Sequence, residues 1–323
     1  MSSVWKLIAA TGRFVKDFYE QKQLLQRHIY PLLKAYPVEN PETGKRIIQY
    51  ANLIPVISGG SFATLRGKKL TEKERLLQTF LAALTPIGDD LFDVEHKAED
   101  ELMQLVSKPF LFSSPQETHP LGVDILKKIH RLLEHPQQFI DYFEKVFSAQ
   151  KASQKQLDKD LSSEEIQQIT FDKGGYSALL YRSIMSHPLG EQEEKAIYQL
   201  GGLVQLMDDT FDVYEDYQQG IRTLPNQTHD ISVIKSFFEA ELMQLGGIFR
   251  SLDYPAKNIE KFLFEITLIL SREMICLEQL LALQDRNQGS FAIEPFERKE
   301  LICDMEKTGN LMKSIRYALA HQM

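Results

Sequence analysis

The sequence is poor in features that would define several common classes of protein. Its 323 residues include two cysteines, Cys276 and Cys303, which lie far apart and fit neither a zinc-binding spacing nor a disulfide framework. Basic residues are outnumbered, with 37 Lys and Arg against 45 Asp and Glu. The resulting net charge of −8 argues against a nucleic-acid-binding protein. The low cysteine content fits a reducing cytoplasm.

Long apolar runs are also absent. The longest uncharged stretch, residues 47–65, contains Pro55, Gly59 and Gly60 and would make a poor membrane-spanning helix. The N-terminal segment has too short an apolar run, and no clear cleavage site, for a signal peptide. We therefore expect a soluble, cytoplasmic protein. Loose peripheral contact with a membrane through an amphipathic segment stays open.

No segment alternates as a β-strand would, and no low-complexity tract or short repeat is present. Helical periodicity dominates, with breaks at Gly- and Pro-containing stretches such as SGGS. Gly174 and Gly175 either loosen a helix or end it. We expect one all-α domain spanning residues 1–323, because no linker divides the chain. The predicted helices cover residues 4–34, 46–57, 71–105, 119–150, 163–186, 190–220, 230–251, 256–285 and 293–321.

Residues 205–220, QLMDDTFDVYEDYQQG, combine helical periodicity with an unusual concentration of negative charge. No Lys or Arg occurs in this stretch, although like charges four residues apart destabilise a helix by a few tenths of a kcal/mol per pair. On a helical wheel all of the carboxylates fall within an arc of about 120°. We call them the second acidic cluster: Asp208, Asp209, Asp212, Glu215 and Asp216.

A first acidic cluster, Asp89, Asp90 and Asp93, has the same D-D-x-x-D spacing. Either cluster could be an ordinary solvated face, but such faces usually mix in Lys or Arg. The alternative is a cation site. Oxygen ligands of this kind suit Mg²⁺, with Mn²⁺ also acceptable, and they argue against zinc. Two facing acidic helices could hold several Mg²⁺ ions around a diphosphate leaving group.

Residues 201–225, GGLVQLMDDTFDVYEDYQQGIRTLP, resemble the second motif of the squalene/phytoene synthase family, one of the class I isoprenoid synthases. Ser61-Phe62, then Arg75, then Asp89 fourteen residues later are similar to the first motif of that family. The sequence departs from the family at Asp208, where an Asn is usual, at Phe211, where an Arg is usual, and at Thr85-Pro86, where Cys-Arg is usual. The positions in register in the second motif are Gly201, Gln205, Leu206, Asp212, Glu215, Asp216, Gly220, Leu224 and Pro225.

The resemblance implies an all-α terpenoid-synthase-like bundle with a central cavity and a prenyl diphosphate substrate. It further implies that Asp89, Asp93, Asp208 and Asp212 are catalytic, and that they hold Mg²⁺ together with Asp90, Glu215 and Asp216. The candidate substrate-binding residues are Ser61, Lys173, Arg182, Gln205, Arg222, Tyr176 and Phe211. An aromatic cavity wall that stabilises a carbocation is expected from Phe80, Phe92, Tyr176, Tyr181 and Phe211.

Several activities remain open. Head-to-head condensation, as in squalene/phytoene synthases, fits the motifs best. A terpene cyclase or a trans-polyprenyl diphosphate synthase shares the same acidic patterns, and Gly44-Lys45-Arg46 is similar to a Gly-Lys-Arg of the latter. The lost family arginines support a different class, a catalytically inactive helical binding protein, whereas the retention of nearly every aspartate argues against it. A helical phosphohydrolase acting on nucleotides would need His-Asp ligands, for which His96 beside the first acidic cluster is the only candidate.

Overall fold

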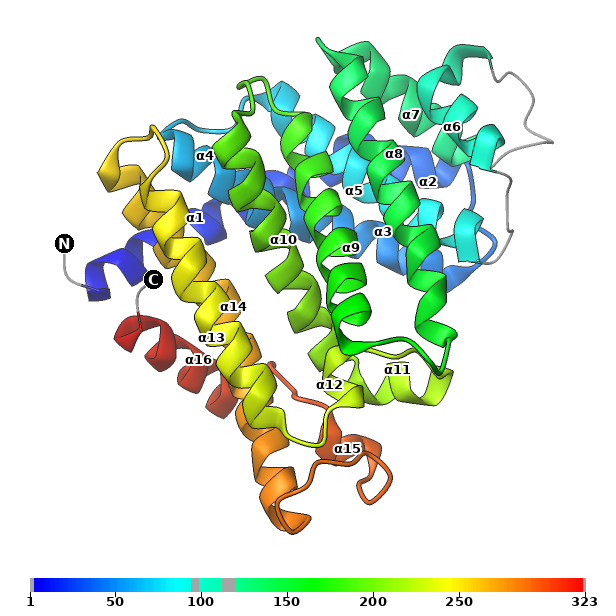
Figure 1. Ribbon diagram of the computed structural model, residues 1–323. Helices are drawn as coiled ribbons and strands as arrows, with labels where there is room; N and C mark the ends of the chain where they lie inside the picture. Colours follow the sequence, from blue (N-terminus) through cyan, green and yellow to red (C-terminus); the bar gives the residue numbers. More distant parts are fainter. Residues whose placement is uncertain (1–2, 94–98, 112–119, 322–323) are drawn as a thin grey trace. The chain divides into compact units, whose positions relative to one another are not determined.

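The computed structural model describes the chain except for residues 1–2, 94–98, 112–119 and 322–323 (Figure 1). The described residues form helices and connecting turns without any β-strand, so the prediction of an all-α protein is confirmed. None of the described helices is both long enough and apolar enough to cross a membrane. His96 lies outside the described residues.

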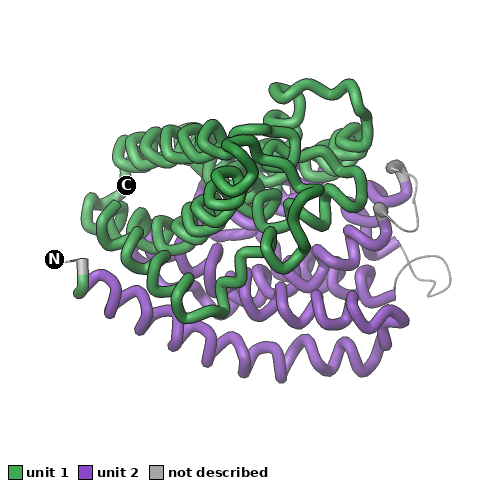
Figure 2. Tube along the Cα trace, turned by 90° about the horizontal axis from the view of Figure 1, so that it is seen from below, with its two compact units in different colours: residues 1–4, 145–179, 189–323 green, residues 5–144, 180–188 purple. Residues whose placement is uncertain are grey.

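The chain divides into two compact units, coloured separately in Figure 2. Unit 1 contains residues 1–4, 145–179 and 189–323, and unit 2 contains residues 5–144 and 180–188. Helices α8 (Pro136–Ser153) and α9 (Ser163–Ser183) each contribute residues to both units, and the first two residues of α1 (Ser3–Leu24) belong to unit 1 while the rest of that helix belongs to unit 2. The first acidic cluster therefore belongs to unit 2 and the second to unit 1.

Unit 2 is organised around α5 (Glu72–Asp93), which packs against α3 and α7. The helix is buried on several sides, since Leu81, Ala82 and Ile87, which point in different directions, are at most 2% exposed. Pro86 lies inside α5 without ending it. The other elements of this unit are α1 (Ser3–Leu24), a π-helical segment (Leu25–Ile29), α2 (Tyr30–Ala35), α3 (Pro41–Ile54), a second π-helical segment (Pro55–Gly59), α4 (Gly60–Arg66), α6 (Glu99–Ser107) and α7 (Pro120–Leu132).

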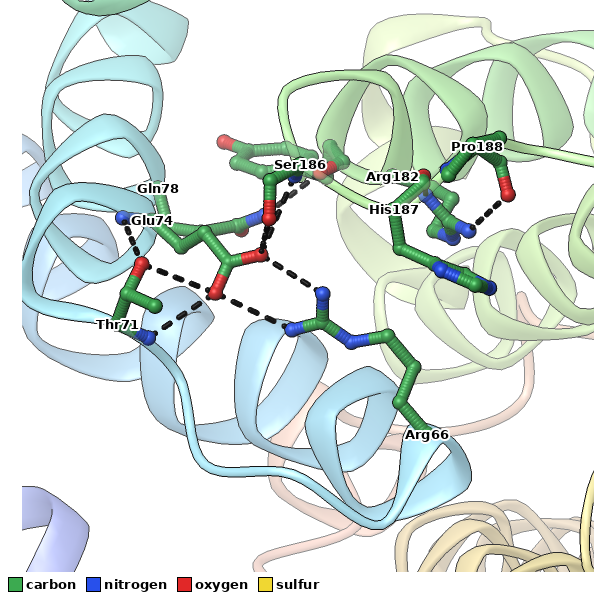
Figure 3. Close-up of polar contacts among 9 residues, drawn as sticks. Arg66, Thr71, Glu74, Gln78, Arg182, Ser186, His187 and Pro188 are labelled. Atoms are coloured by element: carbon green, nitrogen blue, oxygen red, sulfur yellow. Dashed lines mark hydrogen bonds and ion pairs between the residues drawn. The ribbon is translucent and has the colours of Figure 1, made fainter.

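A buried polar network around Glu74 joins three segments of unit 2 (Figure 3). Both terminal nitrogens of Arg66 donate to the Glu74 carboxylate, at 2.8 and 3.2 Å. The backbone N–H of Thr71 and the hydroxyl of Ser186 also donate to it, at 3.0 and 2.8 Å. Desolvation raises the pKa of Glu74, but these bonds outweigh it and lower the pKa to about 2. The network attaches the segment 180–188 to α4 and α5.

Unit 1 is organised around α14 (Ala256–Arg286), which contacts α10, α13 and α16. Its buried positions include Leu270, Met274, Leu277 and Leu280, all fully enclosed. The spacing of these residues is that of a helix with one broad apolar face. The other helices of this unit are α10 (Glu191–Phe211), α11 (Val213–Gln219), α12 (Leu224–Gln227), α13 (Ile231–Arg250), α15 (Arg298–Leu301) and α16 (Thr308–Ala320).

Helices α9 and α10 approach each other closely at two pairs of glycines. A Cβ atom added to Gly174 would lie 2.1 Å from the backbone oxygen of Gly201, and one added to Gly201 would lie 2.3 Å from the oxygen of Gly174. Gly175 and Gly202 instead lie against aromatic rings. Gly174 and Gly175 therefore do not end α9, since the helix continues to Ser183. They permit backbone contact that no larger residue allows.

Several helix boundaries differ from those predicted. The helix predicted from residue 46 begins at Pro41, because the side chain of Asn40 caps it by accepting from the backbone N–H of Glu42 at 3.0 Å. The break predicted at SGGS is wrong, since helix runs through Gly59 and Gly60 into α4. A Cβ atom on Gly60 would lie 2.2 Å from the Arg13 guanidinium, so the glycine provides space for that side chain.

The C-terminal helix predicted over 293–321 is wrong in its first half. Only the short α15 and the later α16 are helical, and the chain turns between them. The Asp304 side chain accepts from the backbone N–H of Glu306 at 2.9 Å, a local bond that competes with helix formation. The helix predicted over 119–150 is likewise divided, because Pro136 begins a new helix, α8.

We expect Gly201→Ala to lower the free energy of unfolding by about 1–3 kcal/mol or more, because the new methyl group overpacks a backbone contact. Urea denaturation followed by circular dichroism measures this change. The matched control is Gly247→Ala in α13, where nothing lies within 4 Å of the added Cβ. That control should stabilise the protein by about 0.5–1 kcal/mol through helix propensity alone. Equal effects of the two variants would contradict the close approach.

Candidate functional site

The second acidic cluster lies where α10 ends and α11 begins. The backbone of Asp212 has φ −94° and ψ 14°, whereas a helix has ψ of about −42°. Helical hydrogen bonds flank it, from the N–H of Asp212 to the oxygen of Asp208 at 2.9 Å and from the N–H of Asp216 to the oxygen of Asp212 at 2.8 Å. The single helix predicted over 190–220 is therefore kinked at Asp212. The kink falls at the residue with a like charge four positions away on each side.

Asp209 is the buried member of the cluster and is held by two hydrogen bonds. The hydroxyl of Thr170 on α9 donates to one carboxylate oxygen at 2.9 Å, and the amide of Gln205 donates to the other at 2.9 Å. The same amide donates to Asp208 at 3.2 Å. Asp209 is 7% exposed, while Asp208 and Asp212 keep solvent contact. Gln205, predicted to bind substrate, thus links two carboxylates of the cluster.

Four aspartates of the second acidic cluster have raised pKa values. Desolvation raises the pKa of Asp208 and takes the pKa of Asp209 to about 6. Desolvation and then repulsion from neighbouring carboxylates raise the pKa of Asp212 to about 6 and that of Asp216 to about 7. The charge of Lys173 on α9 opposes the shift in all four. The site therefore holds more negative charge than its surroundings balance.

Glu215 is separated from the other carboxylates by an ion pair. Arg298 of α15 lies 2.6 Å from its carboxylate through Nη2 and donates to it through Nε at 2.8 Å. Both side chains are partly exposed, so we expect this pair to contribute little to stability. The pair directs Glu215 toward α15. The negative charge of the four aspartates is not balanced by a comparable ion pair.

A buried acid, Glu273 of α14, lies beneath the kink. The Thr210 hydroxyl donates to its Oε1 at 2.8 Å, while its Oε2 has no hydrogen-bond partner. Desolvation raises the pKa of Glu273 well above its ordinary value, and the charge of Asp209 adds to the shift. Sequence reasoning missed this residue. The sequence does contain an indication of it. Glu273 shares a face of the helix with Leu270 and Leu277, where the helical pattern predicts an apolar side chain.

The two cysteines meet in the same region. Cys276 of α14 and Cys303 share one buried cluster with Ile275, and Phe211 packs against it. Interaction between the two thiols, followed by burial, raises the pKa of Cys276, and the same interaction lowers the pKa of Cys303. The Cys276 thiol donates to the backbone oxygen of Thr210 at 3.7 Å. Both thiols are free. Their separation in the sequence concealed this contact, which depends on the turn that follows α15.

The first acidic cluster is engaged by a cation of the protein itself. Arg46 of α3 pairs with Asp89 through Nη2, and its Nη1 lies 3.5 Å from Asp90. The Thr43 hydroxyl donates to Asp90 at 2.5 Å. Asp93 ends α5, and its side chain is outside the described residues, as is that of Phe92. The Arg of the Gly44-Lys45-Arg46 sequence therefore balances part of this cluster.

Three predicted polar substrate contacts have structural partners. Arg182 is 1% exposed and donates to the backbone oxygens of His187 and Pro188 at 2.8 and 3.1 Å (Figure 3). Arg222 donates through its side chain to the backbone oxygen of Lys159. Ser61 is 1% exposed and lies 3.4 Å from the Arg13 guanidinium. Each of these side chains holds a segment of its own unit in place.

The predicted aromatic residues lie in packed surroundings. Tyr176 stacks edge-on against Tyr198 with centroids 5.3 Å apart, and Lys145 lies over its ring. In unit 2, Tyr181 is buried and shares a 2.8 Å hydrogen bond with Thr85. Phe80, also in unit 2, is 3% exposed. The described contacts do not gather these rings around one cavity within a unit.

Within the described part of the chain, no three His, Cys, Asp or Glu side chains are close enough together to form a metal-binding group. The second acidic cluster has oxygen donors and excess negative charge, which suit a hard divalent cation. Its side chains would have to turn toward one another to bind one. Comparison of the chain with protein-family models, with curated proteins and with solved structures gave no match.

We expect Asp209→Asn to stabilise the protein at pH 8 by about 1–3 kcal/mol and to have little effect near pH 4. The pKa of Asp209 in the folded protein, about 6, lies above its value in the unfolded chain. The contribution of this group to the free energy of unfolding is therefore complete below the unfolded pKa, and it is lost as the pH rises through about 6. Urea denaturation at several pH values measures the difference between variant and parent. The exposed Asp285→Asn is the control and should show no such trend. A gain that does not change with pH would contradict the assignment.

Proposed function

We propose that this protein is a Mg²⁺-dependent isoprenoid synthase that ionises an allylic prenyl diphosphate and joins two prenyl units head to head. The observation that carries the proposal is the uncompensated charge of Asp208, Asp209, Asp212 and Asp216, whose raised pKa values are opposed by Lys173 alone among the named cations. The resemblance of residues 201–225 to the family motif supports the same activity. Asp209 is 7% exposed and accepts a hydrogen bond at each carboxylate oxygen, so this part of the cluster is not a solvated face, whereas Asp208 and Asp212 are open to solvent.

Asp208, Asp212 and Asp216 would hold the Mg²⁺ in this proposal. When bound, Mg²⁺ neutralises the diphosphate and makes it a better leaving group. These carboxylates must be ionised to act as ligands, and an adjacent cation favours the ionised form over the protonated form. Gln205 fixes the orientation of Asp208 and Asp209 through its amide, so it acts on the ligands rather than on the substrate.

Lys173 is the proposed contact to the diphosphate. It projects from α9 close enough to the second acidic cluster for its charge to act on four carboxylates. The glycine contact between α9 and α10 fixes how far Lys173 lies from the second acidic cluster, because it determines how closely the two helices approach. Arg182 and Arg222 already donate to backbone oxygens, so Lys173 is the better candidate of the three. An ammonium at this place would stabilise negative charge that develops on the departing group.

The second candidate function is that of a helical binding protein without catalysis. The ion pairs of Arg46 with Asp89 and Asp90 favour it, because a guanidinium there competes with a metal ion for the same oxygens. In an active enzyme Arg46 would have to leave these carboxylates when Mg²⁺ binds, or the reaction would depend on the second acidic cluster.

We expect Asp208→Ala and Asp212→Ala each to lower Mg²⁺-dependent pyrophosphate release by about 10²-fold or more, a loss of the size seen when one electrostatic contact to a transition state is removed. The assay supplies prenyl diphosphates of ten, fifteen or twenty carbons, with and without isopentenyl diphosphate. The control is Asp285→Ala, which removes an exposed carboxylate on α14 and should leave the rate unchanged. Normal turnover by either cluster variant would show that the second acidic cluster is not the site.

The products of the same assay distinguish the branches of the superfamily. Head-to-head joining doubles the carbon number, chain elongation adds five carbons, and cyclisation leaves the number unchanged. Absence of pyrophosphate release with every substrate, from protein whose circular dichroism is that of a folded helical chain, would favour the binding protein.

A further inference from the structure

Helix α1 exposes a concentration of large apolar side chains. Five of the fifteen large hydrophobic residues that are exposed in the described chain lie on it, although α1 has 22 residues. We call them the α1 stripe: Val4, Trp5, Ile8, Val15 and Tyr19, with exposed fractions between 54% and 68%. Scattered apolar residues are normal on a surface, but a group of this density on one helix calls for a partner.

The stripe follows one face of the helix. Val4, Ile8, Val15 and Tyr19 are separated by four, seven and four positions, which places them within about 60° of one another, and Trp5 borders them. Ala10 and Gln21, on the opposite side of the helix, are buried. Helix α1 therefore carries large apolar residues on its exposed face as well as on its inner face, where Ala10 and Leu24 are buried, whereas an ordinary surface helix is polar on the exposed side.

Polar contacts on the inner face hold α1 in this orientation. Arg13 donates to the backbone oxygen of Val56 at 3.1 Å, and Arg75 of α5 donates to the Asp17 carboxylate at 3.0 Å. The Gln21 amide donates to the backbone oxygen of Ala51 at 2.6 Å. These bonds hold residues 13–21 of the helix within unit 2. Rotation that buried the stripe would break all of them, so its exposure is a property of the fold.

The outward side of α1 carries more basic than acidic charge. Lys16 and Lys22 are exposed there. Glu20, whose side chain is 43% exposed, is neutralised by ion pairs with Lys16 at 3.7 Å and with Arg75 at 3.1 Å. This basic and apolar surface stands on a chain whose net charge is −8. Its electrostatic complement is a negatively charged apolar surface.

We propose that α1 binds the surface of an anionic lipid membrane, with the α1 stripe immersed at the boundary between headgroups and acyl chains. Trp and Tyr favour that boundary, and exposed lysines beside an apolar face attract anionic headgroups. The helix lies along the edge of unit 2 (Figure 2), so it can lie flat on a bilayer. A second copy of the chain is a less favourable binding partner for the α1 stripe, because the contact would bring the lysines of both copies together. The proposal does not depend on the proposed catalytic function.

Trp5 makes a direct test practicable, because it is the only tryptophan in the chain and belongs to the stripe. The full-length protein is mixed with vesicles of phosphatidylcholine alone or of phosphatidylcholine and phosphatidylglycerol in equal amounts. We expect a blue shift of Trp5 emission, and co-flotation, with the anionic vesicles. Binding should fall at least tenfold in high salt. Absence of both signals with anionic vesicles at low salt would overturn the proposal.

Two double variants keep Trp5 and separate the stripe from general surface hydrophobicity. Ile8→Glu with Val15→Glu should lower vesicle binding at least tenfold, because it places carboxylates in the stripe. The matched control is Val233→Glu with Met243→Glu, which replaces two exposed apolar residues of α13 and should leave binding unchanged. Circular dichroism confirms that both variants fold. Equal loss in the two variants would refute the assignment to α1.

Analytical ultracentrifugation without lipid tests whether the α1 stripe binds a second copy of the chain instead. If the protein dimerises, with a concentration-dependent blue shift of Trp5 that the stripe variant abolishes, α1 is an interface between copies and the membrane proposal is wrong. A monomer that binds only anionic vesicles supports it. Neither result involves a prenyl substrate, so failure of the proposed catalytic function leaves this test intact.

Discussion

The backbone contact between α9 and α10 is the constraint on which the candidate site depends. Four glycines allow the two helices to approach to a distance that side chains would otherwise prevent. At that distance Thr170 reaches Asp209, and Lys173 lies within electrostatic range of the aspartates at the end of α10. Without the contact, Asp209 would lose its bond from Thr170 and its burial, and its pKa would return toward the ordinary value. The glycines thus determine the chemistry of residues that they do not touch.

Concentrated negative charge costs stability, and the structure shows where this cost is reduced. Glu215 has Arg298 as its partner, and two members of the first acidic cluster have Arg46. The four aspartates around the kink have no comparable partner and rely on the field of Lys173. Desolvated charge left in this state is more common at functional sites than elsewhere, although structural networks also shift pKa values. The two clusters therefore differ in charge balance, and the second is the one left with charge that a bound cation could neutralise.

Much of the fold could be predicted from periodicity, because long amphipathic helices leave a repeating pattern in the sequence. The helical nature of the residues around Asp208 and Asp89 was predicted in this way. The kink at Asp212 was not, since it depends on one ψ angle that no pattern specifies. The helix through Gly59 and Gly60 was missed because glycine there provides room for Arg13, a contact between distant residues.

The site was predictable to a smaller extent. The spacing of the aspartates located the second acidic cluster, but the partners of Arg182 and Arg222 are backbone oxygens that only the folded chain brings near. The contact of Cys276 with Cys303 likewise needs the turn after α15. Local sequence specifies which side chains share a face of a helix, while tertiary packing decides what opposes that face.

Glu273 is a buried ionisable group that the packing of α14 only partly satisfies. One oxygen of this fully buried acid has no hydrogen-bond partner, a state that costs about 1–3 kcal/mol relative to a satisfied group. A chain selected for stability alone would carry leucine or methionine at this position, in keeping with the rest of the α14 face. The glutamate instead places an ionisable group under the kink, against Thr210. The segment beneath the second acidic cluster is therefore a place where a single apolar substitution, such as Glu273→Leu, would raise the thermal stability of the protein.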